Sequence, residues 1–370
     1  MQKPAPPAPS PSRYPPLSGT LSSLFRVLRR SALATARVAG VTTAVAGSRW
    51  RRERLLILCY HGVSLADEHQ WDPQLFMSAE TLRERFTLLR DEGYRVLPLS
   101  EAIVRLHDGT LPPRSVCLTF DDGFADFALR AVPLLEEFEL PATVYVTTHY
   151  MRHRRPIFNL VVPYLLWRAR GRSAPATGAL AALQTLDATS DAARARTANA
   201  VLRLATTQGA STLEKDELAR AVAEAFGLDY DALLASRALQ IMSPAEVRAL
   251  PRSLVDVQLH THRHRSPMEQ ASFEREVRDN RADLAELVPG AVFSHFCYPS
   301  GVYSPGQLPW LRALGVNTAT TCEPALAERD EEPLLLPRFI DTMRVTPSEF
   351  VGWLSGVSQF LPRRTRRRAA

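Results

Sequence analysis

Short apolar runs alternate with amphipathic segments along most of the chain. From residue 55 onward the runs are rich in β-branched and aromatic residues, and their length predicts buried strands. The runs are LLILCY (55–60), YRVLPL (94–99), SVCLTF (115–120), PATVYVTT (141–148), LVDVQLH (254–260), AVFSHFCYP (291–299), NTATT (317–321) and LLLPRF (334–339). Segments with helical spacing of apolar residues lie between most of them, the clearest at 79–93, 126–140 and 272–288. This alternation predicts an α/β fold with a mainly parallel sheet, and seven to eight such units favour a closed or nearly closed barrel over an open doubly wound sheet.

The alternation stops between about residues 149 and 251. Helical spacing near 212–226 and 243–250 predicts a helical insertion between two strands. The start of this stretch carries Phe158, Tyr164 and Trp167. Two interpretations are open for these aromatic residues: a lid or wall over a substrate, and the small core of the insertion itself.

Charge is distributed unevenly along the 370 residues. The composition, 45% hydrophobic and 23% charged, is that of a globular protein, and the formal net charge is +6. Residues 1–54 carry ten basic residues and one acidic residue, and residues 361–370 carry five arginines, whereas 55–360 hold 30 basic against 38 acidic residues. A mildly acidic body argues against a nucleic-acid partner, and basic ends favour contact with an anionic surface. We therefore expect three parts: a disordered and basic N-terminal segment (1–54), a main domain (55–345), and a C-terminal helix with an arginine-rich tail (346–370).

Three interpretations compete for residues 21–54. They are a basic amphipathic helix on an anionic membrane, an export signal around Arg29 and Arg30, and a plain structural helix. Arg37 interrupts the apolar part of an export signal, and no run of eighteen apolar residues predicts a spanning helix. The four cysteines lie in or beside strand-like runs without disulfide spacing, which fits a reducing compartment. We expect a cytoplasmic location or one peripheral to the inner membrane face, with export as the alternative.

Two adjacent carboxylates, Asp121 and Asp122, follow a predicted strand and precede Gly123. Like charges this close raise one pKa unless a cation lies beside them, and a metal ion would remove that cost. The alternative is a structural Asp-Gly turn.

Three of the nine histidines lie within five residues, directly after another predicted strand. His260 and His264 can reach one point if the chain leaves the strand in a helical turn, and imidazole nitrogen with carboxylate oxygen suits zinc and its first-row neighbours. Two weaker signals are the turn Tyr298-Pro299-Ser300-Gly301, whose N–H groups could stabilise an oxyanion, and His61 after the first main strand. All four features follow strands, and the carboxyl edge of parallel strands is where α/β folds gather ligand sites.

Together these motifs resemble the polysaccharide deacetylase superfamily, also known as carbohydrate esterase family four. The residues that carry the resemblance are LCYHGV (58–63), TFDDG (119–123), HTxxH (260–264) and FxYPxG (296–301), in the family's order. The resemblance covers about 55–345 outside the insertion, and it implies that this domain is catalytic and folds as a distorted (β/α) barrel.

The resemblance also implies roles for individual residues. A divalent metal ion, most simply zinc, would be held by Asp122, His260 and His264, and Asp121 would be the general base. A backbone N–H near Ser300, with Tyr298 and Pro299 in the same turn, would hold the oxyanion. The substrate would be an N-acetylated sugar, polysaccharide or lipid-linked glycan.

The chain departs from the family pattern at two places. Cys297 stands where the family often has an arginine that orients the base, and no histidine follows His295 to serve as general acid. His61 is the best replacement. Two other functions stay open: a hydrolase for non-sugar amides or esters, and a carbohydrate-binding relative without activity.

Overall fold

The computed structural model describes residues 20–361, with side chains from residue 27 onward. Its main sheet has eight strands, and every pairing within it is parallel. The strands are β1 (Leu56–Tyr60), β4 (Arg95–Val96), β5 (Ser115–Phe120), β6 (Ala142–Val146), β9 (Val255–Leu259), β10 (His295–Cys297), β11 (Thr318–Thr320) and β12 (Phe339–Ile340).

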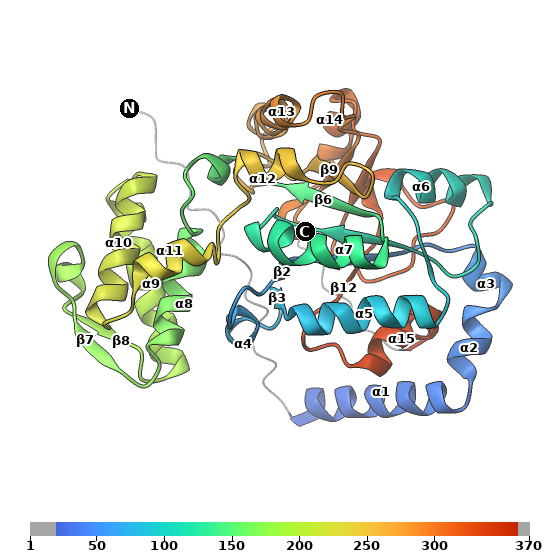
Figure 1. Ribbon diagram of the computed structural model, residues 1–370, viewed down its shortest axis with the longest axis horizontal. Helices are drawn as coiled ribbons and strands as arrows, with labels where there is room; N and C mark the ends of the chain where they lie inside the picture. The colour runs from blue at the N-terminus through green and yellow to red at the C-terminus, as the bar shows by residue number, and fades with distance from the viewer. Residues whose placement is uncertain (1–19, 362–370) are drawn as a thin grey trace.

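The sheet curls almost into a closed barrel. Its strand order is β11, β10, β9, β6, β5, β1 and β12, and β4 pairs with β5. A bridge between Thr320 and Leu336 links the β11 edge to the residues that lead into β12. Helices cover the outside of this sheet (Figure 1). The prediction of a distorted (β/α) barrel is therefore confirmed.

The helices come mostly between consecutive strands, as the sequence predicts. They are α1 (Thr20–Val38), α2 (Val41–Ala46), α3 (Arg49–Arg52), α4 (Glu68–Trp71), α5 (Ala79–Asp91), α6 (Leu99–Asp108), α7 (Val132–Phe138), α8 (Phe158–Arg168), α9 (Asp191–Thr207), α10 (Thr212–Ala225), α11 (Tyr230–Ser236), α12 (Pro244–Ala249), α13 (Gln270–Leu287), α14 (Gln307–Ala313) and α15 (Pro347–Ser355). Two pairs of short strands lie apart from the main sheet: β2 (Gly62–Val63) with β3 (Phe76–Met77), and β7 (Ser173–Pro175) with β8 (Thr185–Asp187).

Side chains of the central strands alternate between two cores. In β1, Leu56 and Leu58 pack in the core under the outer helices, whereas Ile57 belongs to a second core that includes Tyr145 and Cys297. Because both faces of the sheet are buried, its strands appear in the sequence as continuous apolar runs rather than as alternating ones.

Strand register brings the expected site residues to one edge. Tyr60 is paired with Phe120, Val146 with Leu259, and Leu259 with Phe296. Each of these residues lies at or next to the carboxyl end of its strand, so the residues that follow them share one rim of the barrel. Parallel α/β sheets place ligands at this rim.

The insertion forms a helical lobe beside the barrel (Figure 1). It contains α8 to α11 with the β7–β8 hairpin, and its helices α8, α9 and α10 pack on one another. The ring of Tyr164 is buried, stacks on Trp167 and meets Trp71 of α4 edge-on at 5.4 Å. The start of the insertion is therefore fixed against the barrel rim by aromatic packing, rather than standing clear of it as a lid.

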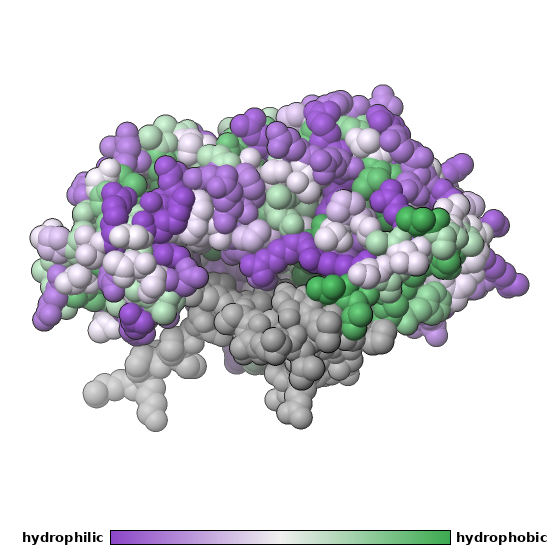
Figure 2. Space-filling view, turned by 90° about the horizontal axis from the view of Figure 1, so that it is seen from below, coloured by the Kyte–Doolittle hydropathy of each residue, from purple (hydrophilic) through white to green (hydrophobic). Residues whose placement is uncertain are grey.

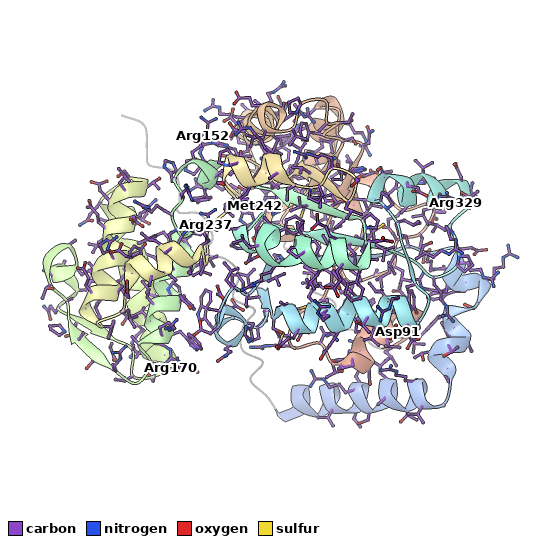
Figure 3. The ribbon with its side chains drawn as sticks, in the orientation of Figure 1. Asp91, Arg152, Arg170, Arg237, Met242 and Arg329 are labelled. Atoms are coloured by element: carbon purple, nitrogen blue, oxygen red, sulfur yellow. The ribbon has the colours of Figure 1, made fainter. Side chains whose placement is uncertain are left out.

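The chain returns from the lobe directly onto the site. Figure 3 labels Arg237 and Met242 in this returning segment, between the lobe and the barrel. The Met242 N–H donates to the Gly123 carbonyl at 2.9 Å, and Phe124 and Ile241 form an antiparallel bridge. The loop that carries the two aspartates is thereby braced by the insertion.

The N-terminal segment differs from the expectation of a disordered basic extension over 1–54. Residues 20–52 form α1, α2 and α3, and α1 packs against α15. Leu33 is fully buried there, and the buried Arg51 guanidinium donates to the carbonyls of Leu354 and Ser115. The described part of this segment is thus built into the fold, because its apolar stripe completes the core beside α15. Residues 1–19 and 362–370, expected to be a disordered start and an arginine-rich tail, lie outside the described residues.

Candidate metal centre and active site

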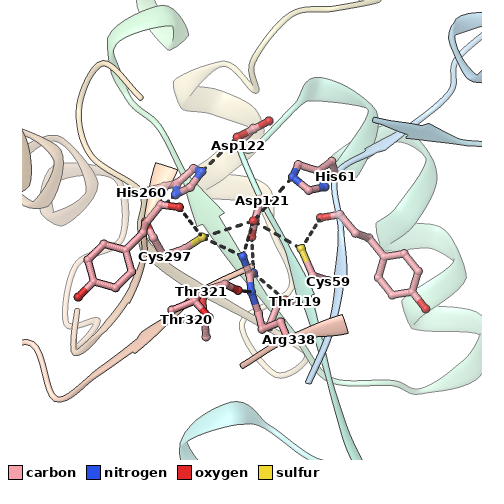
Figure 4. A network of polar contacts seen from close by, with 12 residues as sticks. Cys59, His61, Thr119, Asp121, Asp122, His260, Cys297, Thr320, Thr321 and Arg338 are labelled. Carbon is pink, nitrogen blue, oxygen red and sulfur yellow. Dashed lines mark hydrogen bonds and ion pairs between the residues drawn. The ribbon is translucent and has the colours of Figure 1, made fainter. Parts of the chain in front are cut away.

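The two aspartates lie at the carboxyl end of β5 with their carboxylates turned apart (Figure 4). The Asp121 N–H still donates to the Tyr60 carbonyl at 2.9 Å, as if the strand continued. Asp122 then adopts a left-handed backbone (φ 71°), and so does Gly123 (φ 77°). A side chain at Gly123 would place its Cβ 2.9 Å from Val146 Cγ1, so this turn requires glycine. The strained turn explains how neighbouring residues can face different partners.

Asp122 meets both expected histidines. The Nε2 atoms of His260 and His264 each lie 3.1 Å from the same oxygen, Asp122 Oδ1. Burial alone would raise the pKa of Asp122, but His264 and His260 outweigh it and hold the pKa well below 3.8. Three ligand atoms from three residues therefore face one point, as expected from the sequence.

The loop after β9 is not the helical turn that we expected. Thr261 and His264 both have left-handed backbones, with φ of 62° and 54°. The Thr261 hydroxyl accepts the Arg265 N–H at 3.0 Å, and the Arg263 N–H donates to Glu276 of α13 at 2.7 Å. Two left-handed residues thus reverse the chain and bring both imidazoles to the same side.

A second set of contacts fixes the orientation of His260. Its Nδ1 lies 2.9 Å from the Cys297 carbonyl, which can only accept a hydrogen bond, so Nδ1 carries an N–H. Nε2 is then the nitrogen that faces Asp122. Burial lowers the pKa of His260, but the hydrogen bond to Asp122 and the charges of both aspartates outweigh burial and raise it. A ligand histidine held by a carbonyl behind it is the arrangement found at protein metal sites.

The donor set of Asp122, His260 and His264 fits a divalent metal ion. Their ligand atoms lie within 4.8 Å of one another, and two imidazoles with one carboxylate form a three-ligand zinc set that leaves a position open. Two further groups of possible ligands contain Asp121, one with Cys59 and His61 and one with His260 and Cys297. These groups fit less well, because Asp121 is already paired and burial raises the pKa of both thiols well above 9.0.

Asp121 is paired with an arginine that sequence reasoning missed. Arg338 Nη1 lies 2.7 Å from Asp121 Oδ1, and Arg338 Nη2 lies 2.7 Å from Oδ2 (Figure 4). Arg338 is fully buried, and it also donates to the Thr321 carbonyl and the Thr119 hydroxyl. Burial would raise the pKa of Asp121, but the Arg338 guanidinium outweighs it and holds this pKa far below 3.8. The cation expected beside the aspartates is thus, for Asp121, a side chain of the protein.

Two thiols complete the surroundings of Asp121. Cys297 Sγ lies 3.3 Å from Asp121 Oδ2 and 3.1 Å from Arg338 Nη2, and Cys59 Sγ lies 3.5 Å from the same carboxylate oxygen. The arginine that the family often carries at the position of Cys297 is therefore replaced in space by Arg338, which reaches Asp121 from the residue before β12. The signal in the sequence was one arginine inside the apolar run LLLPRF.

His61 lies on the open side of Asp121. Its Nε2 is 3.8 Å from Asp121 Oδ2, and its side chain is 20% exposed, whereas Asp121 is 3% exposed. The imidazole can therefore reach both Asp121 and solvent at the rim.

The turn after β10 places its three expected residues differently. Ser300 is exposed with a left-handed backbone (φ 57°), and within residues 20–361 its N–H has no hydrogen-bond partner. Pro299 is buried below it. The Tyr298 ring is buried between Phe296 and Tyr303, 5.2 Å and 5.1 Å away, so its side chain packs in the core while its backbone belongs to the turn.

Comparisons with known proteins agree with this arrangement. A family model described as polysaccharide deacetylase matches residues 108–172, which include the aspartate pair. The poly-β-1,6-N-acetyl-D-glucosamine N-deacetylase of Escherichia coli K12 is 40% identical over 98 residues, which are 25% of this chain and 14% of the relative. The chain thus spans about one seventh of the length of this curated relative.

Solved structures match over more of the chain. The Streptococcus pyogenes deacetylase PplD, solved with acetate, has a TM-score of 0.53 at 17% identity and covers 81% of this chain and 98% of its own. IcaB from Ammonifex degensii has a TM-score of 0.52 at 18% identity and covers 82% and 97%. At this identity the two structures show the shared fold. Over residues 108–172 the chain is thus similar in sequence to polysaccharide deacetylases, and over about four fifths of its length it shares the fold of solved deacetylases.

Proposed function

We propose that this protein is a metal-dependent hydrolase that removes the N-acetyl group from an N-acetylated sugar, polysaccharide or lipid-linked glycan. The observation that carries the proposal is the convergence of Asp122, His260 and His264 on one point, with the paired Asp121 beside it. The matched relative of E. coli acts on poly-β-1,6-N-acetyl-D-glucosamine, so this polymer is the first substrate to test.

Asp122, His260 and His264 would hold the metal ion, most simply zinc. When bound, such an ion lowers the pKa of water and polarises a carbonyl oxygen. Asp121 would accept the proton of the attacking water. Arg338 keeps Asp121 ionised and therefore weakly basic. Such a weak base can take a proton only from a water molecule whose own pKa has been lowered.

Two further groups would complete the reaction. His61, whose side chain is 20% exposed and whose Nε2 lies 3.8 Å from Asp121 Oδ2, would donate a proton to the leaving amine nitrogen. The Ser300 N–H, which has no hydrogen-bond partner within residues 20–361, would donate a hydrogen bond to the carbonyl oxygen as negative charge develops on it. The products are acetate and a primary amine on the sugar.

The environment of Asp121 argues against a relative that binds carbohydrate without activity. A buried arginine, two thiols and a histidine hold this carboxylate in place although it is not needed as a metal ligand. A hydrolase of non-sugar amides or esters would use the same residues, and substrate comparison separates it from a glycan deacetylase.

The test measures acetate release by metal-loaded enzyme from poly-β-1,6-N-acetylglucosamine oligomers, chitooligosaccharides, small imides and aryl acetates. We expect the fastest acetate release from an N-acetylated oligosaccharide. Asp121→Asn should abolish this acetate release without changing the metal content. Preference for imides or esters would replace the proposal with the second function. Metal binding without turnover on any of these would favour the carbohydrate-binding relative.

We also propose a location in the cytoplasm or at the inner membrane face. The buried thiols of Cys59, Cys117 and Cys297 are compatible with a reducing compartment. Within residues 20–361, no helix is both long and apolar enough to span a bilayer. Fractionation of cells into cytosol, membrane and periplasm, with detection of the tagged chain, tests this location; recovery in the periplasm would contradict it.

A further inference from the structure

Helix α1 turns an uncharged face outward. Successive residues of a helix are 100° apart, so the half of α1 opposite the buried Leu33 can be identified from the sequence. From residue 27 onward that half consists of Val27, Leu28, Ser31, Ala32, Ala34, Thr35 and Val38, and all seven are exposed. We call this set the α1 outer face. A helix that meets only water normally carries charged residues on such a face.

The apolar residues of the α1 outer face are unusually open to solvent. Val38 is 91% exposed, Leu28 59% and Val27 58%, and Val41 at the start of α2 is 44% exposed. Between Arg37 and Arg49 the sequence has no charged residue. Figure 2 looks onto this side of the molecule and shows hydrophobic residues next to strongly hydrophilic ones.

Arginines border this apolar surface. Arg30 and Arg37 lie on the half of α1 that faces the barrel, and their side chains stay 43% and 37% exposed although they reach Glu349 and Glu92. Arg49 of α3 is 92% exposed, and Arg52 beside it is also exposed. In residues 20–54 the sequence has a single acid, Glu53, which pairs with Arg49 at 2.8 Å.

The last described residues lie beside α3. Phe360 packs on Trp50, which precedes Arg51 in α3, with ring centroids 4.6 Å apart. The described chain ends one residue later, and the sequence has five arginines within 361–370.

We propose that the α1 outer face docks on the surface of an anionic lipid bilayer, with the apolar side chains at the boundary between headgroups and acyl chains. Long arginine side chains can extend from the flanks of such a helix to lipid phosphates while their stems stay in apolar surroundings. A second copy of this chain is a poorer occupant, because a self-complementary contact would bring two surfaces together that are both bordered by arginines. This docking is independent of the deacetylase proposal.

The test is flotation of the full chain with vesicles of phosphatidylcholine alone and of phosphatidylcholine mixed with phosphatidylglycerol. We expect binding to the mixed vesicles, weakened by salt, and at least about tenfold weaker binding to phosphatidylcholine alone. The double variant Leu28→Glu with Val38→Glu removes two apolar contacts and adds two repelling charges, and it should lose binding by about tenfold or more. Arg49→Gln and Arg52→Gln should each weaken binding by about fivefold.

A matched control separates docking from a general effect of added charge. Leu213 and Val292 are 64% and 74% exposed but lie in α10 and after α13, away from α1. Leu213→Glu with Val292→Glu should retain binding, and equal loss in both double variants would overturn the proposal, as would no binding of the unaltered chain.

Two readouts distinguish the remaining outcomes. Self-association without lipid that disappears in Leu28→Glu with Val38→Glu would assign the α1 outer face to a second copy instead. Acetate release from a soluble oligosaccharide should be the same in this variant as in the unaltered chain. If neither protein releases acetate, the deacetylase proposal fails, but the vesicle experiment still tests the docking of the α1 outer face.

Discussion

Both terminal nitrogens of Arg338 lie 2.7 Å from the carboxylate oxygens of Asp121, and neither side chain is more than 3% exposed. A planar guanidinium that holds a carboxylate by two parallel bonds fixes its orientation as well as its charge. Asp121, the proposed general base, follows β5, and the cation that keeps it ionised directly precedes β12, 217 positions further along the chain.

Replacing Arg338 should remove both activity and stability. Arg338→Met would leave a buried carboxylate without its cation, which costs about 3–5 kcal/mol. Because the folded-state pKa of Asp121 lies below its ordinary 3.8, the pair's stabilisation is present above about pH 4 and is lost as the pH falls below it. Urea unfolding between pH 3 and pH 8 should show this acid-dependent part in the unaltered protein and not in the variant.

The double variant Arg338→Met with Asp121→Asn is the control for that loss. It removes both charges, so it should recover much of the stability without recovering turnover. Arg338→Lys should be only partly active, because an ammonium cannot make both parallel bonds. Full activity of Arg338→Met with an unchanged pH profile would contradict the role of this residue.

The contribution of Asp126 to folding stability should depend on pH in the opposite direction to that of Asp121. It is 3% exposed and has no cation among its partners, and burial, Glu68 and Asp122 raise its pKa well above 3.8, against a hydrogen bond from the Val63 backbone. A carboxyl group whose folded-state pKa is raised favours folding less and less as the pH rises from its unfolded pKa to its folded pKa.

Asp126→Asn should therefore be neutral or stabilising near pH 8 and lose this advantage near pH 4. Thermal unfolding of both proteins across this range checks the prediction. A melting temperature of Asp126→Asn that is lower at pH 8 than that of the unaltered protein would show that Asp126 is ionised when folded.

Replacement of His61 tests the missing general acid. His61→Gln removes the imidazole 3.8 Å from Asp121 while nearly keeping its size, so turnover should fall by about 10²–10⁴-fold. Metal content should not change, because the expected ligands are Asp122, His260 and His264. If His61→Ala kept full turnover and the same pH profile, another group would have to supply the proton.

Gly123→Ala should disturb the site through the backbone. The new Cβ would sit 2.9 Å from Val146 Cγ1 at a φ of +77°, so both crowding and backbone strain oppose it. Gly178→Ala is the matched control, since its φ is also positive (+55°) but no atom lies within 4 Å. We expect about 1–2 kcal/mol of destabilisation at Gly178 and about twice that at Gly123, with turnover lost only at Gly123.

Adding Val146→Ala separates the two causes at Gly123. Val146 is fully buried, so Val146→Ala has a cost of its own and is the reference for the double variant. The further loss of unfolding free energy caused by Gly123→Ala in the Val146→Ala background should be smaller than in the unaltered protein, because the two Cγ contacts are gone and mainly backbone strain is left. Equal stability of the two single glycine variants would show that crowding at Val146 has no cost.

The sequence predicted much of the fold because its central strands are buried on both faces. Runs such as SVCLTF are continuous and apolar for that reason, and the observed β5 covers the same residues, Ser115–Phe120. The helix expected at 272–288 is observed as α13 (Gln270–Leu287), because its apolar residues have one clear spacing. The integration of α1 with α15 could not be predicted, since a basic helix has the same pattern whether it packs on the protein or on a membrane.

The site was predictable where its residues directly follow predicted strands. Asp122, His260 and His264 were expected together because each follows a strand, and parallel strands share their carboxyl edge. Arg338 was missed because its role depends on β12 pairing with β1, a long-range contact that aligns Leu58 with Phe339. The burial of the Tyr298 ring could not be predicted, because a tyrosine in a strand-end turn has the same sequence pattern whether its ring faces the rim or the core.

The Asp121–Arg338 pair joins residues 217 positions apart. During synthesis the ribosome therefore releases the aspartate long before its arginine, and a nascent chain that has formed most of the barrel still lacks the counter-charge of Asp121. For the deacetylase that we propose, activity would require the last strand of the main sheet to pair with the first. A product truncated by translation arrest or proteolysis before residue 338 would then be inactive even with all three proposed metal ligands present.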